Sequence, residues 1–195
     1  MNICLRVLTM TFLACMAFPA ARAADDQAFW GLLKEGGKVV LMRHAQTDAG
    51  IGDPPGFVLE QCGTQRNLSA QGRSRAVRTG ARFRQHGVAL AEVLSSRWCR
   101  CLDTARLAFG RVTPSAMLDS VFDQYAPSEA ARTRELMTWL AARVRPGSRA
   151  NVVLVTHAVN IEALAGVSLA SGEMAVATLD GPRKLKVLAR ATPGS

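Results

Sequence analysis

Long apolar runs, internal repeats and low-complexity segments are missing from this sequence of 195 residues. Its longest apolar stretch, residues 7–18, is shorter than the roughly 20 residues that a helix needs to span a bilayer. The absence of any repeat of about 20 residues or more excludes solenoid architectures. A chain of this length favours one domain, and a hydrophobic content of 49% is typical of a globular protein.

The amino terminus has the pattern of a secretory signal peptide. Arg6 gives it a short positive start, residues 7–18 are mostly apolar, and Ala21-Arg22-Ala23 matches an A-x-A cleavage signal. We therefore predict cleavage after Ala23, with residues 1–23 removed and residues 24–195 forming a periplasmic or secreted domain. A membrane anchor is the alternative. No later segment is apolar enough to cross a membrane, so we expect a soluble mature protein.

Acidic residues are scarce, with 15 against 24 lysines and arginines, which gives a net charge of +9. Cleavage lowers it to +7, because residues 1–23 contain two arginines and no acid. This balance favours anionic partners, but no nucleic-acid-binding motif accompanies it. Five arginines in residues 69–85 are interpreted as the solvated face of a helix. The inward face of that helix is predicted to consist of Ala76, Val77, Gly80, Ala81 and Phe83.

Few cysteines remain after the predicted cleavage: Cys62, Cys99 and Cys101. An exported protein meets an oxidising compartment, which favours one disulfide and one free thiol. Cys62 would then be joined to Cys99 or to Cys101, and the sequence does not choose between them. A zinc site built from Cys99, Cys101 and a histidine is the other interpretation, although C-x-C lacks the usual structural-zinc spacing.

Strands alternate with helices along the chain. Apolar, valine-rich or β-prone segments predict strands at residues 38–42, 92–95, 116–121 and 152–156, and a final hairpin at 174–179 and 185–189. Amphipathic spacing and capping residues predict helices at residues 26–33, 69–85, 98–109 and 128–144. Residues 47–67 form a long loop, of a length that is often functional. This order predicts a three-layer α/β/α fold with a mostly parallel sheet and an antiparallel edge.

Histidine is also rare, and two of the three histidines stand at the end of nearly identical six-residue segments. Residues 39–44 read VVLMRH and residues 152–157 read VVLVTH. Each segment is predicted to be a buried strand with a histidine at its carboxyl end, where ligands bind in open α/β sheets. His44 and His157 are therefore expected to face one pocket. His86 has no such context and is interpreted as a residue at the end of a helix.

Two arginines are expected at the same edge of the sheet. Arg43 precedes His44, and a third strand ends at Ser95-Ser96 and leads into Arg100 at the start of a helix. Guanidinium groups match phosphate oxygens in shape and stay charged. A neutral imidazole is a nucleophile that can accept a phosphoryl group. The four residues therefore predict a phosphoryl-transfer site, with a non-catalytic phosphate-binding site as the alternative.

Four segments resemble motifs of the histidine phosphatase superfamily, which has the phosphoglycerate mutase-like fold. LMRHAQT resembles its RHG signature, NLSAQGRSRA the helix start that follows, LSSRWCRCLDTA its second-arginine segment and VVLVTHAVNI its second-histidine segment. They occur in the family's order between Val39 and Ile161. The resemblance implies that His44 forms a phosphohistidine while Arg43, Arg100 and His157 hold the phosphoryl oxygens, and that no metal or other cofactor is needed.

The sequence departs from the family pattern in three places. Ala45 stands at the third RHG position, Arg97 replaces the proline before the second arginine, and the glutamate that protonates the leaving group is absent from its expected position. Asp123 is our candidate for this acid, with Asp119 and Glu129 behind it.

A hydrolase is favoured over a mutase, because a mutase must exclude water and this chain is short and predicted to be exported. It looks most like small periplasmic proteins that include lipopolysaccharide-core heptose phosphatases, which implies a phosphorylated envelope sugar as a possible substrate. Phosphohistidine in a protein is the alternative substrate, but it would require a cytoplasmic location.

Overall fold

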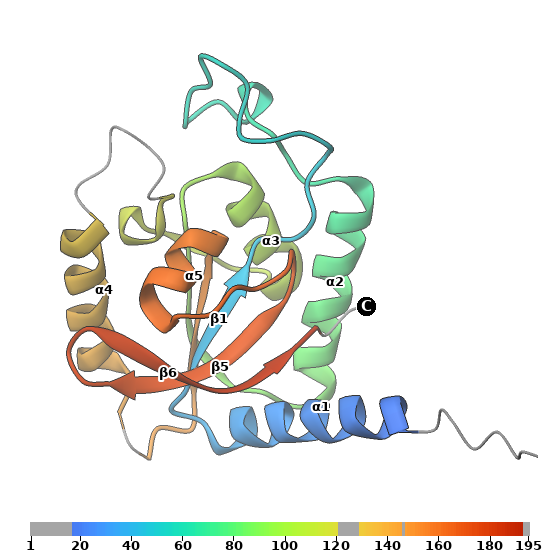
Figure 1. Cartoon of the computed structure of the whole chain (residues 1–195), viewed down its shortest axis with the longest axis vertical. Helices are drawn as coiled ribbons and strands as arrows, with labels where there is room; N and C mark the ends of the chain where they lie inside the picture. Colours follow the sequence, from blue (N-terminus) through green and yellow to red (C-terminus); the bar gives the residue numbers. More distant parts are fainter. Residues whose placement is uncertain (1–16, 121–128, 146, 193–195) are drawn as a thin grey trace, which may run out of the picture.

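A computed structural model describes residues 17–120, 129–145 and 147–192 (Figure 1). Its six strands form one mixed sheet in the order β3-β2-β4-β1-β5-β6. The strands are β1 Val39–Arg43, β2 Leu90–Ser95, β3 Thr113–Pro114, β4 Asn151–Thr156, β5 Met174–Asp180 and β6 Lys184–Ala191. The helices are α1 Ala17–Glu35, α2 Ala70–Gln85, α3 Cys99–Phe109, α4 Glu129–Arg143 and α5 Ala158–Ala165, with short 3-10 turns η1 Cys62–Thr64 and η2 Ala116–Leu118.

The sheet combines a parallel part with an antiparallel edge, as the sequence predicts. β1 pairs in parallel with β4, β4 with β2, and β2 with β3. β5 runs antiparallel to β1 and pairs with β6 in the final hairpin. The carboxyl ends of β2, β4 and β1 therefore lie side by side at one edge of the sheet.

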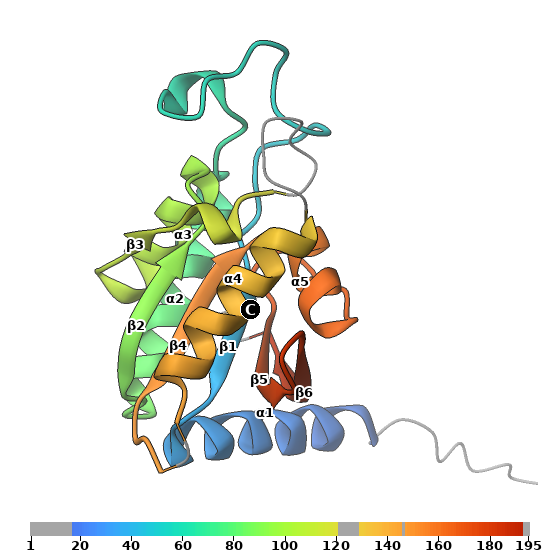
Figure 2. The same ribbon diagram turned by 90° about the vertical axis from the view of Figure 1, so that its left-hand side faces the viewer.

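Alternate side chains of the central strands enter two separate apolar clusters, because successive residues of a strand point to opposite faces. Val39 and Leu41 of β1 pack in a cluster with Leu136 and Leu140 of α4 and Ile161 of α5. Figure 2 shows α4 and α5 on this side of the sheet.

The second cluster fills the opposite face. Val40 and Met42 of β1 pack there with Phe29 of α1, Phe83 of α2 and Ala105 of α3. The layered α/β/α prediction is therefore confirmed. No helix within the described ranges has the length and apolar character needed to cross a membrane.

Four local predictions were wrong or incomplete. Residues 116–121 were expected to form a strand, but Ala116–Leu118 is a 3-10 turn that places Leu118 in the core. Val77 is 46% exposed, because α2 turns Gly80 toward α3, where an added Cβ would lie 1.8 Å from the carbonyl oxygen of Ala108. Helix α5 was not predicted at all, and α1 is longer than residues 26–33.

Candidate active site

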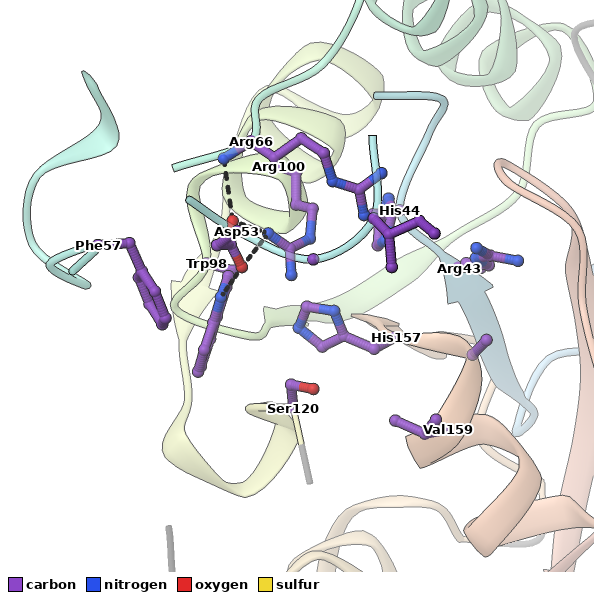
Figure 3. Close-up of a pocket in the computed structure, with 13 residues that line it drawn as sticks. Arg43, His44, Asp53, Phe57, Arg66, Trp98, Arg100, Ser120, His157 and Val159 are labelled. Carbon is purple, nitrogen blue, oxygen red and sulfur yellow. Dashed lines mark hydrogen bonds and ion pairs between the residues drawn. The ribbon is translucent and has the colours of Figure 1, made fainter. Parts of the chain in front are cut away.

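Three neighbouring strand ends converge on one cavity of about 610 Å³ (Figure 3). The backbone N–H of His44, after β1, donates to Thr156 O of β4 at 3.0 Å. The N–H of Ser96, after β2, donates to Val155 O at 2.9 Å. The cavity is lined by Arg43, His44, Ile51, Gly52, Asp53, Phe57, Arg66, Trp98, Arg100, Ser120, His157, Ala158 and Val159. The structure therefore brings together His44, His157, Arg43 and Arg100, as the sequence predicts.

His44 is held in the tautomer that a nucleophile requires. Its Nδ1 lies 2.8 Å from the carbonyl oxygen of Ala45, which can only accept, so Nδ1 carries the proton and Nε2 keeps its lone pair. Ala45 is fixed in turn, because its N–H donates to Thr104 Oγ1 at 3.0 Å. Burial, together with the charges of Arg100, Arg43 and Arg66, lowers the pKa of His44 to about 3, against the opposing effect of the Ala45 hydrogen bond.

His157 faces His44 across the cavity. The ring centroids are 5.6 Å apart, and the edge of the His157 ring also packs on Trp98 at 5.5 Å. Its Nε2 lies 2.9 Å from Ser96 Oγ, which fixes the plane of the ring. Burial, followed by repulsion from His44 and Arg100, holds the pKa of His157 well below its usual value. Both shifts favour the neutral imidazole at neutral pH.

These two histidines make the fold sensitive to acid. Unfolded histidine has a pKa of about 6.5, whereas both folded pKa values are lower, so the unfolded state binds more protons below that pH. Their contribution to stability is fully present above pH 6.5 and is lost as the pH falls toward the folded pKa values. We expect the free energy of unfolding to fall by up to about 1.4 kcal/mol per pH unit for each histidine. Urea unfolding at pH 7.5, 6 and 5 measures this slope; an equal slope in His44→Gln would contradict it.

Arg100 and Arg43 supply cationic walls beside the imidazoles. Arg100 lies in the first turn of α3 and is 6% exposed, so its guanidinium is fixed within the cavity wall. Arg43 is anchored by NH1, which donates to Leu169 O at 3.0 Å. Burial, and then the charge of Arg66, lowers the pKa of Arg43. An oxyanion placed between these groups would meet guanidinium donors beside a neutral imidazole nucleophile.

The family model of the histidine phosphatase superfamily (branch 1) matches residues 39–121, the segment that holds Arg43, His44 and Arg100. Over this segment the chain is similar to the histidine phosphatase superfamily, and the match supports phosphatase activity. No curated protein matches the sequence.

Several solved structures share the fold. The protein histidine phosphatase SixA, complexed with tungstate, has a TM-score of 0.55 at 16% identity, covering 80% of this chain and 97% of its own. YhfR of Bacillus stearothermophilus has a TM-score of 0.58 at 17% identity, covering 78% and 95%. A mycobacterial glucosyl-3-phosphoglycerate phosphatase has a TM-score of 0.57 at 18% identity, covering 78% and 97%.

A long loop, residues 47–67 (Figure 1), contributes several residues to the lining of the cavity. A disulfide joins Cys62 to Cys99, the residue before Arg100, and so resolves the open pairing. Gln65 reinforces this attachment, since its Oε1 accepts the N–H of Cys99 at 3.0 Å. The remaining thiol, Cys101, is buried, and burial raises its pKa to about 12. Within the described ranges, no group of three or more potential ligands could hold a metal ion.

Removing the disulfide should destabilise the protein substantially. The two cysteines are 37 residues apart, and closing a loop of that size restricts the unfolded chain by about 3–4 kcal/mol. We expect dithiothreitol to lower the urea midpoint of the wild type to that of Cys62→Ser, which itself should not respond to the reductant. A wild-type midpoint that is insensitive to dithiothreitol would contradict this prediction.

The sequence did not identify Asp53, which binds Arg100 in the cavity wall. Both carboxylate oxygens accept from Arg100 NH1, at 2.7 and 3.0 Å, and Asp53 also accepts from Trp98 Nε1 at 3.0 Å and from the N–H of Arg66 at 2.9 Å. Burial raises the pKa of Asp53, but these hydrogen bonds and the charge of Arg100 outweigh it and lower the pKa overall. The length of loop 47–67 was the only signal that it holds pocket residues.

The candidate proton donors are only partly described. Asp123 lies outside the described residues, as does the side chain of Glu129. Asp119 does not line the cavity: it is 2% exposed and accepts from the N–H and Nε of Arg97 at 2.8 and 2.7 Å, and from Ser96 Oγ at 3.3 Å. The charge of Arg97 is therefore paired with Asp119.

Proposed function

We propose that this protein is a metal-independent phosphomonoester hydrolase that acts through a phosphohistidine on His44. The observation that carries the proposal is the hydrogen bond from His44 Nδ1 to Ala45 O, which leaves the lone pair on Nε2; the lowered pKa of His44 is consistent with it. Arg43, Arg100 and His157 surround it in the same cavity. This arrangement combines a nucleophile with charge stabilisation, the two requirements of phosphoryl transfer.

The proposed reaction has two steps. The Nε2 lone pair of His44 attacks phosphorus, the bond to the leaving oxygen breaks, and that oxygen takes the electron pair and a proton. Water then attacks the phosphohistidine and returns a proton to the donor, the P–N bond breaks with its electron pair going back to Nε2, and phosphate leaves with His44 regenerated. Asp123 is the proposed donor of the first proton; in the sequence it stands three residues after Ser120, which lines the cavity. Arg43, Arg100 and His157 hold the non-bridging oxygens throughout.

We further propose that the enzyme is exported and acts on a phosphorylated cell-envelope sugar. The signal-peptide pattern of residues 1–23 supports export. The Cys62–Cys99 disulfide supports it independently, because disulfides persist mainly in oxidising compartments. Sequencing the amino terminus of protein released by osmotic shock tests the location: a terminus at Ala24 is expected, and retention of Met1 in the cytoplasm would refute export.

Phosphate release from p-nitrophenyl phosphate, with a chelator present, tests the reaction. We expect activity that survives the chelator, because the described residues supply both the nucleophile and the charge. Activity that disappears with the chelator would refute metal independence. Tight binding of phosphate without turnover would instead establish a phosphate-binding protein. Phosphate release from purified lipopolysaccharide core tests the substrate, and an active enzyme that releases none would exclude it.

A further inference from the structure

Loop 47–67 carries a third arginine into the cavity, outside the segments that resemble the family motifs. Arg66 donates from NH1 to Thr47 Oγ1 and to Gly50 O, each at 2.9 Å. These bonds hold the guanidinium in place, and Figure 3 shows the side chain running toward His44. The backbone is fixed as well, because the N–H of Arg66 donates to Asp53 Oδ1 at 2.9 Å.

The charge of Arg66 is not balanced by a carboxylate among the described residues. Asp53 is the one acid in the described lining, and its side chain is engaged by Arg100, Trp98 and the backbone of Arg66. The described ion pairs include none that involves Arg66. Its charge instead acts on Arg43 and His44 and lowers the pKa of both. The cavity therefore concentrates like charges, which is unfavourable until an anion binds.

The hydrogen-bonding capacity of the cavity points in the same direction. Within the described ranges, Nε of Arg43, of Arg66 and of Arg100 is buried without a hydrogen-bond partner. Buried donors are nearly always satisfied, so unsatisfied ones in one pocket favour a ligand with several acceptors. Three arginines against one carboxylate also leave two positive charges in excess. A phosphomonoester above its second pKa of about 6 carries close to two negative charges.

We propose that Arg66 is a third phosphoryl-binding arginine, which matches the pocket to dianionic phosphomonoesters and disfavours monoanionic diesters. This inference rests on the proposed function, since it assigns Arg66 to the same phosphoryl group that His44 attacks. Arg66 thereby determines specificity for the ester class through charge. Asp53 and the disulfide position it, because they fix the loop that carries it.

Oxyanion binding tests this role without requiring catalysis. We would measure the Kd of inorganic phosphate and of tungstate at pH 8 by calorimetry for the wild type, Arg66→Met, Arg66→Lys and Arg84→Met, an exposed arginine of α2. A charge-assisted contact of this kind predicts about 10- to 100-fold weaker binding by Arg66→Met. Arg66→Lys should lose less, because it keeps the charge, and Arg84→Met should bind within about twofold of the wild type.

Substrate discrimination provides a second readout that a purely structural role would not change. The ratio of kcat/KM for p-nitrophenyl phosphate to that for bis(p-nitrophenyl) phosphate should fall by about tenfold in Arg66→Met. A lower Tm with an unchanged Kd and an unchanged ratio would overturn the proposal and make Arg66 a structural clamp of its loop. Wild-type binding and turnover with Arg66→Met equal to Arg84→Met would refute the role of Arg66 alone. A wild type that neither binds nor hydrolyses would remove the proposed function and this inference together.

Discussion

The variant His44→Ala is expected to lower kcat for p-nitrophenyl phosphate by roughly 10⁴-fold or more, because removal of a nucleophile abolishes the covalent pathway. His157 is the other imidazole in the described lining of the cavity. His157 is neutral as well, but its Nε2 is already engaged by Ser96. Quenching the wild type during turnover with a ³²P-labelled substrate should trap an acid-labile phosphohistidine, and the same experiment on His44→Ala should trap none.

His86→Ala is the matched control for that measurement. His86 ends α2 and stacks on Trp30 at 4.2 Å, outside the residues that line the cavity. Its replacement should leave kcat within about twofold of the wild type, since it contacts none of the reacting groups. Label retained by His44→Ala would show that another residue is the nucleophile. Equal loss of activity in both variants would point to damage to the fold rather than to the chemistry.

Much of the site could be predicted because its key residues follow strands directly. The segments VVLMRH and VVLVTH place His44 and His157 immediately after β1 and β4. These two strands pair in parallel, and in their register Arg43 lies opposite Thr156. Once both strands are buried in the same sheet, neighbouring carboxyl ends fix where the histidines lie. Arg100 follows from the same rule, since it lies in the first turn of the helix after β2.

The loop contacts could not be predicted in the same way. Asp53 meets Arg100 across 47 residues, and Arg66 meets Thr47 across 19. No periodicity relates such positions, because an irregular loop has no repeating geometry. The Cys62–Cys99 disulfide fixes the loop against α3, and three cysteines left two pairings open. Short turns such as Ala116–Leu118 were missed for a similar reason, since tertiary packing of Leu118 overrides local strand preference.

Replacing Arg100 should produce the second large effect. Arg100→Met is expected to lower kcat/KM by about 10³-fold, in the range found when an arginine that stabilises a transferring phosphoryl group is removed. Part of this loss has a cause besides the missing guanidinium. Asp53 would keep its carboxylate in the cavity without an ion-pair partner. The side chains of Arg100 and Asp53, which form this pair, are 7% and 8% exposed, so the pair is buried. Breaking a buried pair costs about 3–5 kcal/mol, so a lower Tm is also expected.

A double-mutant cycle separates the two causes. Arg100→Met leaves Asp53 to repel the substrate, so adding Asp53→Asn should recover about tenfold in kcat/KM and part of the Tm. The control is Arg106→Met on the same helix, whose side chain is 55% exposed and 3.7 Å from Asp103; it should change neither quantity appreciably. If Asp53→Asn lowers the activity of Arg100→Met further, Asp53 acts on the substrate directly rather than through Arg100. Such a result would make the loop carboxylate a catalytic group and a rival to Asp123 as the proton donor.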